Sequence, residues 1–284
     1  MSAQGFDRRV TPARADLAAA HLRGVVEAPR YVEARIMQVV EAIVDLRPQP
    51  DPARSIDTQA LYGERVFVYD EHEGWAWGQL ERDDYVGWLP MAALAKAGKP
   101  ATHRVETLRT FLYPARSIKA PPLAALTHGA LAHVDAIDGE FALTAQGALW
   151  ASHLAPLSDH PQDFVAAAER YLGVPYLWGG RSSAGTDCSG LIQTALRAVG
   201  VAAPRDSDML AATMGEPIDC DDSLAGLSRG DLVFWKGHCG VMQDATQLLH
   251  ANGHHMLVVS EPLVEARDRI RDKSFGPITG VRRL

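Results

Sequence analysis

One cysteine and two histidines, in this order along the chain, are of the right types for covalent catalysis. Cys188 precedes His238 by 50 residues, and His250 follows 12 residues later. A thiolate is a strong nucleophile, a neutral imidazole can take the thiol proton, and a second imidazole can hold the first in orientation. This pattern predicts a triad whose third place is filled by a histidine, provided that the fold brings the three side chains together.

Cys188 is predicted at the start of a helix. The apolar residues that follow it recur at helical spacing: Leu191, Ile192, Ala195, Leu196 and Val199. Thr186 or Asp187 can cap this helix and Gly200 can end it. A first-turn cysteine has a lowered thiol pKa, because unpaired amides and the helix dipole favour the thiolate.

Small residues flank the cysteine at Gly185, Ser189 and Gly190. We expect them to let a substrate carbonyl approach the backbone, whose amides could stabilise an oxyanion. The alternative is structural, since a lone cysteine at a helix start is commonly a small buried hydrophobe.

Strands are predicted around both histidines. The segments 231–235, 238–242 and 248–251 have strand composition, with a turn at Lys236 and Gly237 between the first two. His238 and His250 should therefore lie on neighbouring strands, where they can meet a cysteine on a helix.

A zinc site is the rival interpretation, because Cys239, His254 and His255 add further soft ligands. The spacing argues against it. His238 and Cys239 are adjacent on one strand and should point to opposite faces, and no C-x-x-C or H-E-x-x-H motif is present. His254 and His255 follow Asn252 and Gly253 and are predicted in a solvated turn, so we expect no metal and no cofactor.

Composition narrows the class of protein. The 284 residues are 47% hydrophobic and 22% charged, with a net charge of −7, which is typical of a soluble chain of two or three domains. The sequence has no basic patch of the kind that binds nucleic acids or membrane surfaces, so we expect neither as a partner. The three cysteines suit a reducing compartment, and the charged N-terminus lacks a signal-like apolar core, so we expect a cytoplasmic protein.

The part before the cysteine is predicted to be mostly strands. Residues 1–35 should form an arm with a short helix at 16–22. Alternating patterns in RVFVY and WAWGQL, broken by turns, predict a small β barrel at 36–97. A weaker copy of the same order of strands covers 98–157.

The last domain is predicted at 158–284. A helix should start near Pro161 and carry an apolar face of Phe164, Ala167, Ala168, Tyr171 and Leu172 before Gly173. Tyr176 and Trp178 follow in an extended segment, where the default reading is core aromatics. Arg205, Asp206 and Ser207 could simply form a polar turn.

Several motifs in the right order resemble the NlpC/p60 cysteine peptidases of bacterial cell-wall peptides: DCSG at 187–190, GDLVFW followed by GH at 237–238, and LLHANG with His250. Cys239 departs from the aliphatic residue that is usual after the first histidine. The barrel at 36–97 resembles a bacterial SH3 domain in its DLR, YGE, GWAWGQ and YVGW segments. The resemblance implies an α+β fold, with a papain-like NlpC/p60 domain after two small SH3-like barrels.

The same resemblance implies a γ-D-glutamyl-L-diamino acid endopeptidase acting on murein tripeptides or tetrapeptides with a free N-terminal L-alanine, and hence peptide recycling in the cell. It places Tyr176, Trp178 and Ser207 at the substrate. An end-selective cleft also needs a wall that closes it and acidic or hydroxyl groups that pair with the terminal ammonium. Asp187 and Ser189 flank the nucleophile, and Tyr85 and Glu64 of the first barrel are our candidates for the wall. The Tyr85 hydroxyl could hold the ammonium together with Asp187; the alternative is that Tyr85 is a barrel core or rim residue. Open alternatives are an exported hydrolase targeted by its barrels, an acyltransferase, and an inactive scaffold.

Overall fold

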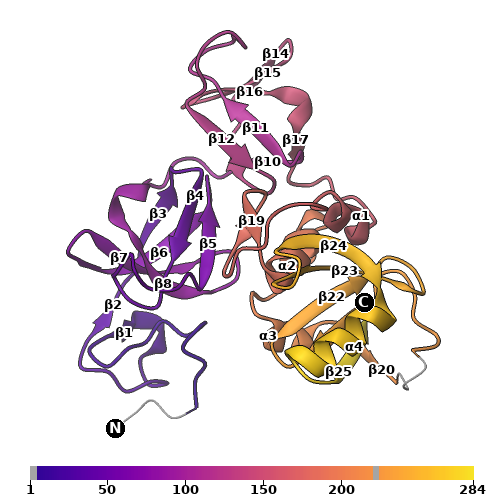
Figure 1. Ribbon diagram of the computed structural model, residues 1–284. Coiled ribbons are helices and arrows are strands. Elements are labelled where there is room, and N and C mark those ends of the chain that lie inside the picture. Colours follow the sequence, from indigo (N-terminus) through magenta and orange to yellow (C-terminus); the bar gives the residue numbers. More distant parts are fainter. Residues whose placement is uncertain (1–4, 220–223) are drawn as a thin grey trace. The chain divides into compact units, whose positions relative to one another are not determined.

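The computed structural model describes residues 5–219 and 224–284, so Cys220 lies outside the described residues. The chain divides into two units, residues 1–158 and 159–284 (Figure 1). The division falls next to the predicted start of the catalytic domain at residue 158. None of the helices in the described ranges is long and apolar enough to cross a membrane.

The N-terminal arm is where the predicted helix at 16–22 is wrong. The elements observed are two short parallel strands and one 3-10 turn: β1 (Ala18–Ala19), β2 (Tyr31–Val32) and η1 (Ala20–Leu22). Asp16 pairs with the Arg14 guanidinium at 2.7 Å instead of capping a helix. Leu17 is fully buried beside Tyr69 and Trp77, so tertiary packing outweighs the helix propensity of the alanines.

The first barrel follows the arm. Its elements are β3 (Arg35–Val39), β4 (Ile43–Leu46), β5 (Thr58–Leu61), β6 (Arg65–His72), β7 (Trp75–Leu80), β8 (Val86–Pro90), η2 (Met91–Ala93) and β9 (Leu94–Lys96). The strands form a sheet in the order β8-β7-β6-β3-β9 and a separate hairpin of β4 and β5. The residues that alternate inward, among them Val44, Leu46, Leu80 and Leu89, make its core.

The second barrel repeats this order of elements. They are β10 (His103–Val105), β11 (Arg109–Leu112), β12 (Ala124–Thr127), β13 (Leu131–Ala132), β14 (Ala136–Asp138), β15 (Phe141–Thr144), β16 (Gly147–Trp150), η3 (Ala151–His153) and β17 (Leu154–Pro156). In both barrels a hairpin follows the first strand, and a 3-10 turn leads to a last strand that pairs with the first. A core of its own, around Leu112, Leu126 and Leu149, supports the second barrel.

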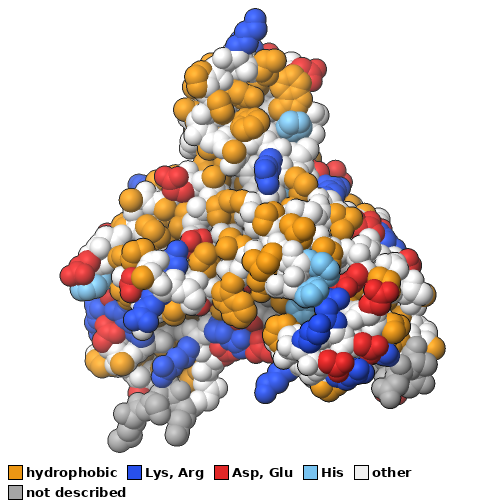
Figure 2. Space-filling model, in the orientation of Figure 1, with side chains coloured by type: hydrophobic (Ala, Val, Ile, Leu, Met, Phe, Trp, Pro, Cys, Tyr) orange, Lys and Arg blue, Asp and Glu red, His pale blue; other side chains and the backbone are white. Residues whose placement is uncertain are grey.

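The second barrel also exposes large hydrophobic side chains (Figure 2). Phe111, Ile118, Leu123 and Ile137 are each about half or more exposed. Apolar surface of this kind can mark an interaction site, but nothing in the structure shows what would cover it.

The second unit carries the predicted chemistry. Its elements are α1 (Phe164–Glu169), β18 (Arg181–Ser182), β19 (Gly185–Thr186), α2 (Cys188–Ala198), α3 (Ser207–Thr213), β20 (Glu216–Ile218), β21 (Leu232–Trp235), β22 (His238–Met242), β23 (Gln247–Asn252), β24 (Leu257–Pro262), α4 (Leu263–Lys273) and β25 (Ile278–Arg283). Six strands form one antiparallel sheet in the order β20-β25-β21-β22-β23-β24 (Figure 1). α2 packs on β22 and β23, while α4 packs on β23 and β24.

Helix α1 starts later than predicted. Its N-cap is Asp163, whose Oδ1 accepts hydrogen bonds from the amides of Val165 and Ala166 at 2.9 and 3.2 Å, so Pro161 lies outside the helix. Tyr171 is buried as expected, but Leu172 is 47% exposed. Helix α2 matches its prediction, because its apolar residues are buried against the sheet.

Candidate active site

Cys188 is the first residue of α2, where the sequence predicted it. The helix is capped by Asp187, whose Oδ1 accepts a hydrogen bond from the Gly190 amide at 2.7 Å. The cysteine is 7% exposed. It therefore lies buried at the end of the helix where the amide dipoles favour a negative charge.

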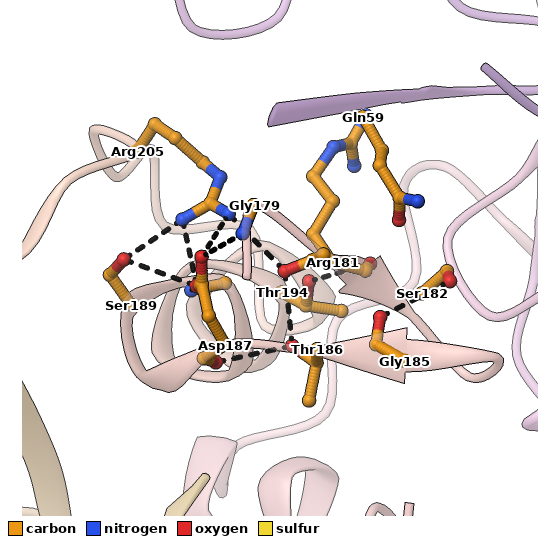
Figure 3. Close-up of polar contacts among 12 residues, drawn as sticks. Gln59, Gly179, Arg181, Ser182, Gly185, Thr186, Asp187, Ser189, Thr194 and Arg205 are labelled. Atoms are coloured by element: carbon orange, nitrogen blue, oxygen red, sulfur yellow. Dashed lines mark hydrogen bonds and ion pairs between the residues drawn. The ribbon is translucent and has the colours of Figure 1, made fainter. Parts of the chain in front are cut away.

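The cap residue is itself held by an arginine (Figure 3). Arg205 donates to Asp187 Oδ2 at 2.6 Å, to Asp187 Oδ1 at 2.9 Å and to Ser189 Oγ at 2.8 Å. Burial raises the pKa of the Asp187 carboxyl, whereas the charge of Arg205 and its hydrogen bonds oppose that shift. We treat Asp187 as ionised, because a bidentate arginine needs an anionic partner. The cluster fixes the start of α2.

The glycines on either side of Cys188 are required by the packing of the protein. A Cβ atom on Gly190 would lie 2.2 Å from the Gly180 carbonyl oxygen, and one on Gly185 would lie 2.6 Å from Leu177 Cβ. The Gly190 amide already donates to Asp187. The first-turn amides of Cys188 and Ser189 are therefore the better candidates for oxyanion donors.

The two histidines meet on neighbouring strands. His238 is the first residue of β22, His250 lies in β23, and His238 Nε2 is 2.8 Å from His250 Nδ1. The face of the His238 ring stacks on Phe275, with centroids 5.4 Å apart and planes 6° apart. Since Nε2 is used by His250, Nδ1 is the atom of His238 that can serve the thiol.

Two residues of β22 lower the pKa of the Cys188 thiol. The largest effect is a hydrogen bond from the Cys239 side chain; burial opposes it, and the charge and a hydrogen bond of His238 lower the pKa further. The same contact raises the pKa of Cys239. The thiolate therefore belongs on Cys188, which also has the helix N-terminus.

This arrangement corrects one argument from the sequence. We expected His238 and Cys239 to point apart, yet hydrogen bonds of both lower the pKa of the Cys188 thiol. Within residues 5–219 and 224–284, no group of three or more His, Cys, Asp and Glu side chains is arranged to hold a metal ion. His254 and His255 lie in an exposed turn between β23 and β24.

Behind the histidine pair lies an ion pair. His250 Nε2 is 2.7 Å from Glu261 Oε1 on β24, and Arg269 on α4 contacts both oxygens of Glu261 at 2.6 Å. Burial is the main cause that lowers the pKa of His250 to about 4, although the hydrogen bond to Glu261 raises it. His250 is therefore a neutral imidazole at pH 7.

The other predicted residues of this unit lie at different depths. Tyr176 is half-buried and forms a β-bridge with Thr186, two residues before Cys188. Burial is the main cause that raises the pKa of its hydroxyl, and the charges of Cys188 and Asp187 add to it. Trp178 is 64% exposed, which excludes the core reading for this residue. Ser207 is the half-buried first residue of α3.

Tyr85 and Glu64 lie in the first barrel. The Tyr85 ring is 5% exposed and belongs to the barrel core, as the alternative reading expected. Glu64 accepts a hydrogen bond from the Leu61 amide at 3.0 Å and lies 3.3 Å from Arg82. Their role at the substrate stays a proposal.

Sequence reasoning missed Arg205 and the Glu261–Arg269 pair. Arg205 was read as part of a polar turn. Its position two residues before Ser207 gives no signal of its contact with Asp187. Glu261 lies 11 residues beyond His250 and reaches it only because β23 and β24 pair, with Leu249 opposite Ser260. Spacing along the chain cannot predict such a contact.

Comparison with known proteins agrees with this geometry. Residues 46–94 match the bacterial dipeptidyl-peptidase SH3 domain, and residues 173–267 match the NlpC/P60 family. The γ-D-glutamyl-L-lysine dipeptidyl-peptidase of Bacillus subtilis (strain 168) is 31% identical over 222 residues, which cover 69% of this chain and 72% of that protein. This chain belongs to the NlpC/P60 family.

Other relatives extend the comparison. The γ-D-glutamyl-L-lysine dipeptidyl-peptidase of Bacillus cereus (strain ATCC 10987 / NRS 248) is 27% identical, over 64% of this chain and 61% of that protein. The crystal structure of an NlpC/P60 family protein from Bacillus cereus ATCC 10987 has a TM-score of 0.72 at 20% identity, over 87% of this chain and 99% of that one. These likenesses confirm the predicted α+β fold. Membership of the NlpC/P60 family and the two dipeptidyl-peptidase relatives identify this chain as a peptidase.

Proposed function

We propose that this protein is a cysteine peptidase that hydrolyses the bond between γ-D-glutamate and the diamino acid in murein peptides with a free N-terminal L-alanine. The observation that carries the chemistry is the 2.8 Å contact of the His238 and His250 rings on β22 and β23, the two strands on which the helix of Cys188 packs; His238 also lowers the pKa of the Cys188 thiol. The choice of bond is supported by the names of the two Bacillus relatives and by the match of residues 46–94 to a dipeptidyl-peptidase SH3 domain.

The reaction follows from this geometry. The thiol proton passes to His238, and Cys188 Sγ attacks the γ-carbonyl carbon of D-glutamate, where the first-turn amides of α2 stabilise the oxyanion. His238 then gives its proton to the leaving amine of the diamino acid, the C–N bond breaks, and a thioester remains on Cys188. A water that loses its proton to His238 hydrolyses the thioester and restores the thiol.

A cut two residues from a free N-terminus requires partners for an ammonium group, because an unpaired buried charge is costly. Asp187 brings negative charge next to Cys188, although it shares that charge with Arg205. We therefore assign further acceptors to the hydroxyls of Ser189 and Ser207 and, from the first barrel, to Tyr85 and Glu64. Half-buried Tyr176 and exposed Trp178 are assigned to the substrate cleft.

We further propose that the substrate is a released peptide in the cytoplasm and that the reaction belongs to cell-wall peptide recycling. Two free, buried thiols at Cys188 and Cys239 suit a reducing compartment. Cell fractionation tests this part independently, and recovery of the protein only outside the cytoplasm would contradict it.

The test of the activity uses two matched substrates. L-Ala-γ-D-Glu-meso-diaminopimelate and its N-acetylated form are incubated with the protein and read by mass spectrometry. The free peptide should give L-Ala-D-Glu and diaminopimelate, and the acetylated form should react at least about a hundredfold more slowly. Equal cleavage of both forms would contradict the requirement for a free amine, and transfer of the acyl group to an added amine in place of water would make the protein an acyltransferase.

Removing one hydroxyl tests the contribution of the first barrel. Tyr85→Phe keeps the ring in the barrel core, so the fold should persist. If the hydroxyl holds the ammonium, the fall in kcat/KM for the free peptide corresponds to roughly 1 to 2 kcal/mol of lost transition-state stabilisation. The slow rate on the acetylated peptide should stay unchanged. Unchanged kinetics on both peptides would leave Tyr85 as a core residue only.

A further inference from the structure

The proposed reaction makes no use of the partly buried ion pair behind His250. The Glu261 and Arg269 side chains are 11% and 17% exposed. Arg269 donates to both carboxylate oxygens, and Glu261 Oε1 also contacts His250 Nε2. A carboxylate held this closely at the far side of the second histidine can control which nitrogen of that ring carries the proton.

The ionisation of Glu261 decides its role in the hydrogen bond. Burial raises the pKa of this carboxyl, but the hydrogen bonds from His250 and Arg269 together outweigh burial and lower the pKa to about 2. Glu261 is thus a carboxylate at neutral pH, and a carboxylate only accepts hydrogen bonds. The proton of neutral His250 must therefore be on Nε2.

The remaining protons follow in sequence. With Nε2 protonated, His250 Nδ1 has a lone pair and accepts a hydrogen bond from His238 Nε2, 2.8 Å away. His238 then has its proton on Nε2, which leaves a lone pair on Nδ1 for the proton of Cys188. The opposite tautomer of His250 would donate to His238, place the His238 proton on Nδ1, and prevent it from acting as a base.

One neighbour favours that opposite tautomer. The Asn252 amide nitrogen Nδ2 lies 2.9 Å from His250 Nε2, and it could donate there if Nε2 carried no proton. Hydrogen bonds to an ionised acceptor are roughly twice as strong as those between neutral groups. The competition between Asn252 and Glu261 is therefore decided by the charge of Glu261.

We propose that Glu261, clamped by Arg269, is a positioning residue that holds His250 in the Nε2-protonated tautomer and so makes His238 the general base. This inference rests on the proposed function, because it requires His238 to receive the Cys188 proton.

Arg269 has a distinct part in this arrangement. Burial lowers the pKa of His250 most; the hydrogen bond to Glu261 raises it, and the positive charge of Arg269 lowers it further. Four other ionisable groups face this cluster. The charge of His238 acts on His250, and that of Glu265 acts on Arg269. From the turn between β23 and β24, His255 lies 3.9 Å from Glu261, and His254 interacts with the charges of Glu261 and Arg269. Arg269 and Glu261 together orient His250 without protonating it.

A structural role for the pair is the alternative, because Arg269 on α4 and Glu261 on β24 join two elements. Under that alternative, removing either partner breaks the same contact and has the same effect. Under the proposal the two changes differ. Glu261→Leu lets Asn252 select the wrong tautomer, whereas Arg269→Leu keeps the carboxylate and the right tautomer.

The experiment reads the histidine rings directly. Nitrogen-15 spectra of the imidazoles at pH 7 report which ring nitrogen is protonated, in the wild type, Glu261→Leu, Arg269→Leu and the control Glu216→Gln, an exposed carboxylate on β20. The wild type, control and Arg269→Leu should show His250 protonated on Nε2, and Glu261→Leu on Nδ1. A wild-type His250 protonated on Nδ1 overturns the proposal without any variant.

Alkylation of Cys188 by iodoacetamide supplies a second measurement that needs no substrate. The rate at pH 7 should fall by at least about a hundredfold in Glu261→Leu, as a wrong tautomer does in a triad, and by less than about tenfold in Arg269→Leu. Equal losses in both variants would support the structural role instead. Neither measurement involves a peptide. The proposed role of Glu261 can therefore be confirmed even if the protein cleaves a different bond, and it can be contradicted even if the proposed peptide is hydrolysed.

Discussion

His238 Nε2 and His250 Nδ1 lie 2.8 Å apart across two neighbouring strands. The strand pairing of β22 and β23 ends at Val241 opposite Leu249, and Gly240 is the residue next to His250 on the facing strand. A Cβ atom on Gly240 would lie 3.1 Å from His250 Cβ and 2.8 Å from Leu248 Cδ1. The missing side chain at Gly240 thus makes room for the ring contact on which the proposed mechanism depends.

Gly240→Ala should therefore lower kcat strongly and have a smaller effect on the free energy of unfolding. The added methyl pushes against His250 and misaligns the histidine pair, and small misplacements of catalytic groups can cost about a hundredfold. Steady-state kinetics and thermal unfolding measure the two effects. Gly280→Ala on β25 is the matched control, since a Cβ atom there meets nothing within 4 Å; similar kinetic losses in both variants would contradict this explanation of Gly240.

Cys188 should be the most reactive thiol of the protein. Its pKa is lowered by Cys239 and His238, so Cys188 stays a thiolate at pH 7. An ordinary thiol has its pKa above pH 7, and its thiolate fraction falls about tenfold for each pH unit below that pKa. Iodoacetamide at pH 7 should modify Cys188 before Cys239 or Cys220, as read by peptide mapping, and activity should fall in step. Faster modification of another cysteine with activity intact would remove Cys188 from its role.

The two histidines should differ in importance. His238→Ala removes the group that carries the proton and should lower kcat on the order of 10³-fold or more. His250→Gln keeps a side chain that can accept a hydrogen bond from His238 and should lose less. An active His238→Ala would contradict the mechanism, and a larger loss in His250→Gln would reverse the order of the roles.

Stability should depend on pH through His250. Its pKa is lowered to about 4 in the folded protein, mainly by burial, against about 6.5 in an unfolded chain. The unfolded state therefore binds the proton first as the pH falls, and stability is lost from about pH 6.5 down to about pH 4, by roughly 3 kcal/mol. Denaturant unfolding across this range should show a flatter curve for His250→Gln; parallel curves would show that another group is responsible.

How much of this could be predicted from the sequence depends on the range of the interaction. The start of α2 and the turn at Gly237 are local features, with Asp187 as cap and a φ of 89° at Gly237, and both were predicted. The helix at 16–22 failed because Leu17 is buried against residues that are distant in the sequence. Periodicity reports local preference, and tertiary packing can override it.

The site shows the same limit. Cys188, His238 and His250 were found because their types are rare and chemically distinctive. Arg205 and Glu261 are ordinary charged residues, and only the fold reveals that one holds the cap of α2 and the other holds His250. Burial turns these common side chains into specific partners, and burial of a charged residue has no signature in a single sequence.

The most direct measurement of the central claim is the mass of the acyl-enzyme. L-Ala-γ-D-Glu-meso-diaminopimelate is mixed with excess protein, quenched in acid within one turnover, and digested for peptide mapping. We predict an L-Ala-D-Glu group on the peptide that contains Cys188, joined through the γ-carbonyl, with free diaminopimelate in solution. The same group on Cys239, or an acyl group from any other part of the substrate, would contradict the account.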